Sequence, residues 1–102
     1  MSLSPEQRRE YRAIAHNLKP VVIIGDKGLT ENLQQELDRA LNDHELIKVK
    51  IATPDRDQRQ ELTEALCKAS GAQLVQSIGK IAVIMRRAAK PNPKLSNLQR
   101  AQ

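Results

Sequence analysis

A strand, a glycine loop and a helix follow one another early in this chain and set most of its architecture. The segment Val21–Ile24 is apolar and β-branched at every position, and Gly25 and Gly28 come directly after it. A run that is apolar on both faces predicts a strand buried on both sides, so we expect it to be the central strand of a sheet. Thr30 is a suitable N-cap for a helix whose leucines share one face.

The rest of the chain alternates in the same way. A helix is expected from the Ser4-Pro5 start to the break at Lys19-Pro20. The segment 46–51 alternates as a strand does, and a helix after Asp55 is closed by Gly71. Segments 73–78 and 81–85 flank Gly79-Lys80 as a type II′ hairpin would. The order helix, strand, helix, strand, helix, strand, strand predicts an α/β fold with three helices and a mixed four-stranded sheet.

The 102 residues suffice for one domain. We place it at residues 1–86 and expect a flexible basic tail at 87–102, where two prolines and scattered cations show no sustained period. Residues 1–85 hold twelve cations and twelve carboxylates, so the net charge of +5 lies entirely in the last residues. No segment is apolar enough for a membrane span or a secretory signal, and Cys67 is the single cysteine, so we expect a cytoplasmic protein without membrane association.

Several kinds of chemistry find no support in the residues. With Tyr11 as the one aromatic residue, binding by base stacking on several aromatic side chains is excluded. His16 and His44 have no metal-ligating partner at helical spacing, and Cys67 is better explained as a structural thiol than as a nucleophile. We therefore expect neither a catalytic site, nor a metal, nor a cofactor.

Two features could bind a polyanion. The loop Gly25, Asp26, Lys27, Gly28 would present backbone amides beside a helix N-terminus, although an ordinary strand-to-helix turn would have the same residues. The second feature is a set of cations that local structure should expose: Lys27, Lys48, Lys50, Lys80 and Arg86. They could track phosphates, or they could be a solvated strand face.

Four motifs in order carry a family resemblance. They are Leu18-Lys19-Pro20-Val21-Val22, then Gly25-x-x-Gly28-Leu29-Thr30, then His44-Glu45-Leu46-Ile47-Lys48-Val49-Lys50, and finally Ile78-Gly79-Lys80 leading to Arg86. In this respect the chain resembles the CRM domain, the chloroplast RNA splicing and ribosome maturation family, and within it the single-domain bacterial YhbY type. The similarity covers about residues 3–86.

The resemblance implies a KH-like RNA-binding domain without catalytic activity, related in fold to the C-terminal domain of translation initiation factor three. It implies that Gly25, Asp26, Lys27 and Gly28 contact RNA and that Lys48, Lys50, Lys80 and Arg86 occupy the family's basic positions. Asp26 departs from the polar or basic residue that the family often has there. Met85 replaces the tyrosine common before the arginine.

We therefore expect a monomeric RNA-binding protein that associates with ribosomal RNA of precursor large subunits during ribosome assembly. The alternative from the residues is a protein-interaction module whose basic tail docks on an acidic partner.

Overall fold

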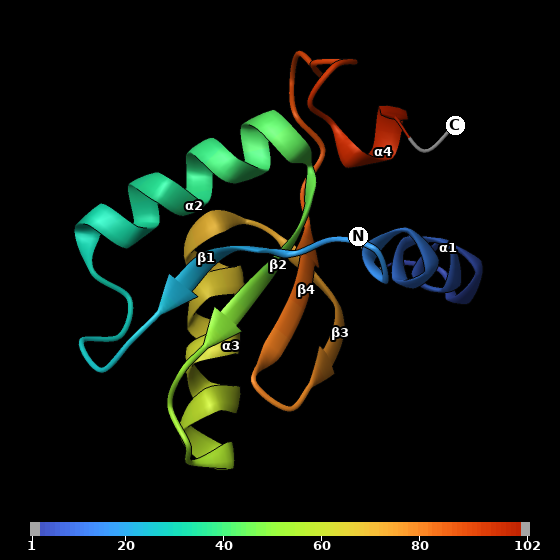
Figure 1. The fold of residues 1–102 in the computed structure, drawn as a ribbon. Coiled ribbons are helices and arrows are strands. Elements are labelled where there is room, and N and C mark those ends of the chain that lie inside the picture. Colours follow the sequence, from blue (N-terminus) through green and yellow to red (C-terminus); the bar gives the residue numbers. More distant parts are fainter. Residues whose placement is uncertain (1–2, 101–102) are drawn as a thin grey trace.

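The computed structural model describes residues 3–100 (Figure 1). Its elements in chain order are α1 (Pro5–Ala15), β1 (Pro20–Ile24), α2 (Glu31–His44), β2 (Leu46–Ile51), α3 (Arg56–Ser70), β3 (Gln73–Ile78), β4 (Ile81–Met85) and α4 (Asn97–Arg100). The predicted α/β fold, with three long helices and a mixed four-stranded sheet, is confirmed. The single-turn helix α4 was not expected. Within residues 3–100, no helix has the length and apolar character needed to cross a membrane.

The strand order in the sheet is β1-β2-β4-β3, with β1 parallel to β2 and the other pairs antiparallel. The expectation that Val21–Ile24 forms the central strand is wrong, because β1 lies at an edge. Val22 and Ile24 point into the core, whereas Val21 and Ile23 are 52% and 60% exposed. The β-branched run therefore contributes one face to the core and leaves the other face apolar in solvent.

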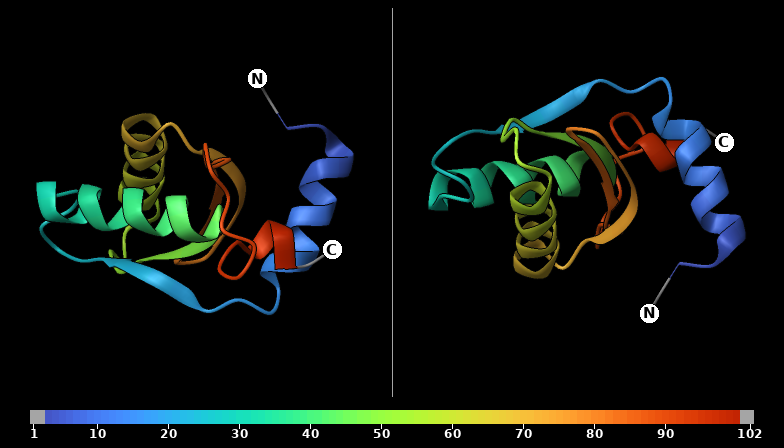
Figure 2. Two further views of the ribbon diagram at one scale, coloured as in Figure 1. Left: turned by 90° about the horizontal axis from the view of Figure 1, so that it is seen from above. Right: turned by 90° about the horizontal axis from the view of Figure 1, so that it is seen from below.

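Helices cover the two faces of the sheet unequally (Figure 2). On one face α2 and α3 pack over the main core, in which Leu37, Leu41 and Leu66 meet the inward residues of the strands. On the other face α1 and α4 cover only part of the sheet, and the smaller core there includes Tyr11, Ala15 and Leu98.

The caps predicted from the sequence are present. Ser4 and Gln7 form a reciprocal capping box, and the Thr30 hydroxyl accepts from the backbone N–H of Leu33 at the start of α2. Gly71 ends α3 in the left-handed conformation with φ of 73°. One boundary differs, since α1 ends at Ala15 rather than at Lys19; the Leu18 amide turns back to the carbonyl of Ala15.

Residues after Arg86, expected to form a flexible tail, return to the domain (Figure 1). Ser96 and Leu98 are buried, and the Asn97 side-chain amide donates to the carbonyl of Leu46 at 2.6 Å. The carboxylate of Glu45 accepts from the Ala88 amide at 2.8 Å and from the Ser96 hydroxyl at 2.6 Å. The packing therefore extends to Leu98, while residues 101–102 of the expected tail lie outside the described residues.

Candidate nucleic-acid interface

The glycine loop joins the end of β1 to the start of α2. The Gly28 amide donates to the carbonyl of Gly25 at 3.0 Å and closes a tight turn, which leaves the side chains of Asp26 and Lys27 exposed. The turn delivers the chain to the Thr30 cap, so the loop lies beside the positive end of the α2 dipole. Backbone amides and a helix N-terminus in this arrangement suit an anionic group.

The two glycines of the loop have different structural roles. Gly28 has φ of +68°, a conformation that L side chains rarely adopt, so glycine is required there by the backbone. Gly25 has no such φ, and a Cβ built on it would meet nothing within 4 Å. The fold does not need glycine at position 25, so its effect is to leave the loop surface open.

Three lysines lie at the same end of the sheet as the loop. The Ile24 carbonyl accepts from the Ala52 amide at 2.8 Å, and the Lys80 carbonyl accepts from the Ile51 amide at 2.7 Å, so the ends of β1, β2 and the β3–β4 hairpin are joined. Lys27, Lys50 and Lys80 are exposed. Within residues 3–100, their ammonium groups form no hydrogen bond or ion pair, and they remain available for an external anion.

The part of the sheet that α1 leaves uncovered carries two rows of cross-strand neighbours. The row nearer the loop runs from β3 to β1 through Ile78, Ile81, Lys50 and Ile23. The second row runs through Gln76, Val83, Lys48 and Pro20. Both predicted strand lysines therefore lie on the same surface, with Lys48 half-buried near α1 and Lys50 exposed near the loop.

A groove of about 210 Å³ lies between α1 and this face of the sheet. Its lining residues are Arg12, Ala15, His16, Lys48, Gln76, Ile78, Ile81 and Val83. The arginines of α1 are interleaved with Glu6 and Glu10 in the sequence, so their charge alone does not mark them as part of a cationic surface. The position of Arg12, four residues before His16 and on the same side of α1, is the signal that could have been followed.

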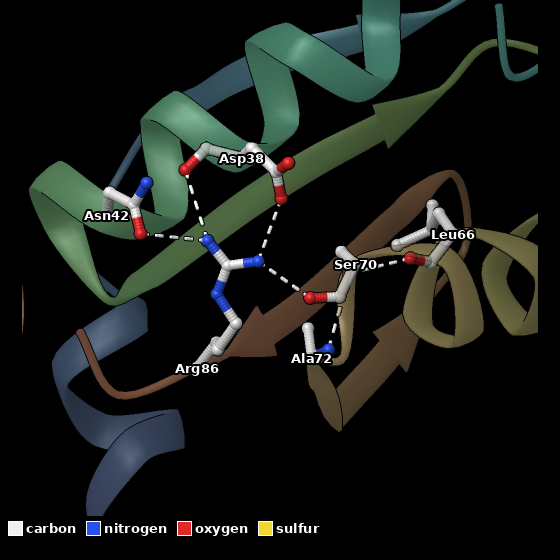
Figure 3. A network of polar contacts seen from close by, with 6 residues as sticks. All are labelled: Asp38, Asn42, Leu66, Ser70, Ala72 and Arg86. Carbon is white, nitrogen blue, oxygen red and sulfur yellow. Dashed lines mark hydrogen bonds and ion pairs between the residues drawn. The ribbon is translucent and has the colours of Figure 1, made fainter. Parts of the chain in front are cut away.

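The structure does not bring Arg86 to the loop. Arg86 follows β4 at the opposite end of the sheet, where Leu46 pairs with Met85. Its guanidinium donates to Asp38 Oδ1 at 2.8 Å, the Ser70 carbonyl at 2.6 Å, the Asp38 carbonyl at 3.2 Å and Asn42 Oδ1 at 3.0 Å (Figure 3). These bonds join α2 to the end of α3, so the structure explains Arg86 as a packing residue without reference to RNA.

The side chains of Cys67 and His44 have structural surroundings. Burial raises the pKa of the Cys67 thiol and so disfavours the thiolate. Among residues 3–100, no three histidine, cysteine or carboxylate side chains lie close enough together to hold a metal ion. The imidazole of His44 contacts the Leu95 carbonyl at 2.9 Å and so links α2 to the C-terminal segment.

Comparisons with known proteins show which family the chain resembles. The family model of the CRS1 / YhbY (CRM) domain matches residues 3–86. A Pseudomonas aeruginosa protein named as a probable RNA-binding protein is 53% identical over 100 residues, 98% of this chain and 96% of that protein. A Haemophilus influenzae protein named as an RNA-binding protein is 45% identical over 85 residues, covering 83% of this chain and 86% of that protein.

A solved structure is also similar. The solution structure of a Staphylococcus aureus protein, described as a candidate RNA-binding protein, has a TM-score of 0.76 and 39% sequence identity to this chain. The match covers 86% of this chain and 92% of that one.

Proposed function

The chain belongs to the CRS1 / YhbY (CRM) domain family, and we propose that it is an RNA-binding protein that associates with precursors of the large ribosomal subunit during their assembly. In this proposal the protein is a cytoplasmic monomer that acts by binding rather than by catalysis. Both the family membership and the RNA-binding names of the relatives support RNA as the partner.

The observation that carries the proposal is the loop end of the sheet. The Gly25–Gly28 turn and the N-terminus of α2 lie there, and so do Lys27, Lys50 and Lys80, which have no partner within residues 3–100. Backbone amides and lysines bind phosphates without reading sequence, so this end would capture the RNA backbone. Lys48 extends the same cationic surface along β2.

Specificity under this proposal comes from RNA shape. Tyr11, the one aromatic residue of the sequence, is buried on the side of α1 that faces the sheet and cannot serve as an external stacking platform. A protein without such platforms distinguishes RNA chiefly by the arrangement of its backbone. An assembling ribosomal particle offers folded RNA of this kind.

Sedimentation of the native protein in cell extract tests the proposal. We expect it to comigrate with precursors of the large subunit and to leave those fractions after ribonuclease treatment. A chain that stays at the top of the gradient would contradict association with ribosomal particles. Comigration that survives complete RNA digestion would favour a protein partner instead.

A further inference from the structure

We infer that the uncovered face of the sheet, together with the groove beside α1, holds the bases of an unpaired RNA segment whose backbone is bound at the loop. This inference rests on the proposed RNA binding and adds a second site to it. We name this surface the base face and define it by Ile23, Lys48, Lys50, Gln76, Ile78 and Ile81.

Exposed aliphatic side chains are the first observation. Ile78 and Ile23 are 62% and 60% exposed, yet they lie on the same face of the sheet as the smaller core. They are joined across β4 and β2 by the half-buried Ile81 and by the aliphatic stem of Lys50. A contiguous apolar strip of this kind, bordered by cations, is typical of a binding surface rather than of ordinary solvent-exposed sheet.

The charge of the surface favours an anionic occupant over an apolar one. Arg12, Lys48 and Lys50 border the strip, the groove lining contains no carboxylate, and none of the three cations is paired within residues 3–100. An anionic ligand can neutralise all three, whereas an apolar protein partner would have to desolvate them. The strip is also continuous with the loop end through Lys50, which is directly opposite Ile23 on β1 and Ile81 on β4.

The shape of the surface selects unpaired nucleotides. The groove of about 210 Å³ has room for a nucleobase, and it is too small for a partner helix with a diameter of roughly 10 Å. Bases in a duplex are stacked and cannot turn their faces to the aliphatic floor. Lys48 and Lys50 are two residues apart, roughly 7 Å along a strand, which suits the phosphates of neighbouring nucleotides. The Gln76 amide lies in the groove wall, where it could bond to the edge of a base.

Matched oligonucleotides separate base binding from backbone binding. The probes are a uridine 12-mer, an abasic ribose-phosphate 12-mer of equal charge, and a 12-base-pair RNA duplex, each titrated into the full-length protein at fixed salt. The variant is Ile78→Thr, which removes apolar surface but keeps β-branching at an exposed strand position. Leu95→Thr is the control, because Leu95 is also an exposed aliphatic residue but lies in the C-terminal segment.

We expect the native protein to bind the uridine 12-mer more tightly than the abasic one. Ile78→Thr should weaken binding of the uridine 12-mer by about fivefold and leave the abasic 12-mer and the duplex unchanged, because the substitution affects only the surface on which the bases lie. Leu95→Thr should bind all three probes like the native protein. Circular dichroism verifies that both variants are folded.

Three results would overturn the inference, and each can be distinguished from the others. The native protein could bind the uridine and abasic 12-mers with equal affinity, or Ile78→Thr could bind the uridine 12-mer like the native protein. Either result would show that the base face does not bind bases, and it would leave the proposed backbone binding at the loop intact. If the native protein binds none of the three probes, nor ribosomal RNA, the proposed RNA binding fails and the base face fails with it. Loss of an RNase-resistant protein association in Ile78→Thr, with RNA binding intact, would assign the strip to a protein partner.

Discussion

At the end of the sheet where β1 and β2 finish, Lys27, Lys50 and Lys80 extend into solvent and have no partner among residues 3–100. At the other end, the Arg86 guanidinium donates four hydrogen bonds and the carboxylate of the buried Glu45 accepts two. The three lysines can bind an external anion without breaking any bond within the protein. Arg86 and Glu45 instead hold helices and the C-terminal segment in place. A charged residue type therefore does not by itself show whether the side chain binds a ligand or stabilises the fold.

At the end of the sheet opposite the loop, Glu45 is the residue whose loss we expect to destabilise the fold most. Its side chain is 1% exposed, its backbone has φ of 63°, and its carboxylate ties Ala88 and Ser96 to the start of β2. Because alanine retains the Cβ, the strain of the positive φ is the same in both proteins, and Glu45→Ala isolates the loss of the carboxylate.

We expect Glu45→Ala to lower the free energy of unfolding by about 3 kcal/mol, since two bonds to a charged acceptor are removed from the buried Ser96 hydroxyl and the half-buried Ala88 amide. Urea denaturation measures this change. Glu36→Ala, at an exposed position of α2, is the matched control and should change stability by less than about 0.5 kcal/mol. Native-like stability of Glu45→Ala would show that the C-terminal segment is not held by this carboxylate.

Arg86 provides the next test, through a comparison of two substitutions. Arg86→Ala should destabilise the fold by about 2 kcal/mol, and Arg86→Lys should recover little of the loss because an ammonium cannot reproduce the bonds to Asp38, Asn42 and Ser70. Both variants, below their unfolding midpoints, should bind RNA with native affinity. A stable Arg86→Ala protein with weakened RNA binding would return Arg86 to the interface.

The loop-end lysines should govern the salt dependence of RNA binding. Replacing Lys27, Lys50 and Lys80 by alanine should reduce the slope of log K against log salt by roughly 0.7 to 0.9 for each phosphate that the protein no longer neutralises. Lys90→Ala with Lys94→Ala removes exposed cations of the C-terminal segment and should leave the slope nearly unchanged. If the second variant instead loses the slope and the first retains it, the C-terminal segment binds the RNA.

The smallest expected change in stability comes from alanine substitution of the loop glycines, and it should differ between Gly25 and Gly28. Gly28→Ala should cost about 1 kcal/mol because its φ of +68° becomes strained. Gly25→Ala should leave stability unchanged, since its Cβ meets nothing, but it should weaken RNA binding by obstructing close approach of the backbone to phosphate. RNA titration and thermal unfolding of both variants give the comparison. If Gly25→Ala binds RNA with native affinity, close approach of the backbone at position 25 to phosphate is not needed for binding.

Much of the fold was predictable because its signals are local. Helix starts at Ser4, Thr30 and Asp55 depend on bonds to residues two or three positions later, and all three caps are present. The alternation of 46–51 likewise places Ile47, Val49 and Ile51 on one face of β2, and in the structure that face packs in the main core. The loop Gly25–Gly28 and the lysines around it could be named from the sequence, whereas their binding to RNA stays a prediction.

What the sequence determined by itself is therefore the list of elements, their caps and the position of the glycine loop, because these depend on neighbours within a few residues. Only the tertiary structure placed β1 at an edge, brought Arg12 beside Lys48 and used Arg86 to join two helices. Each of these depends on pairing or packing between distant segments; Glu45 and Ser96, for example, are 51 positions apart. A β-branched run has the same local preference at the centre or the edge of a sheet, and only the arrangement of the other strands decides whether its second face is buried or free to bind.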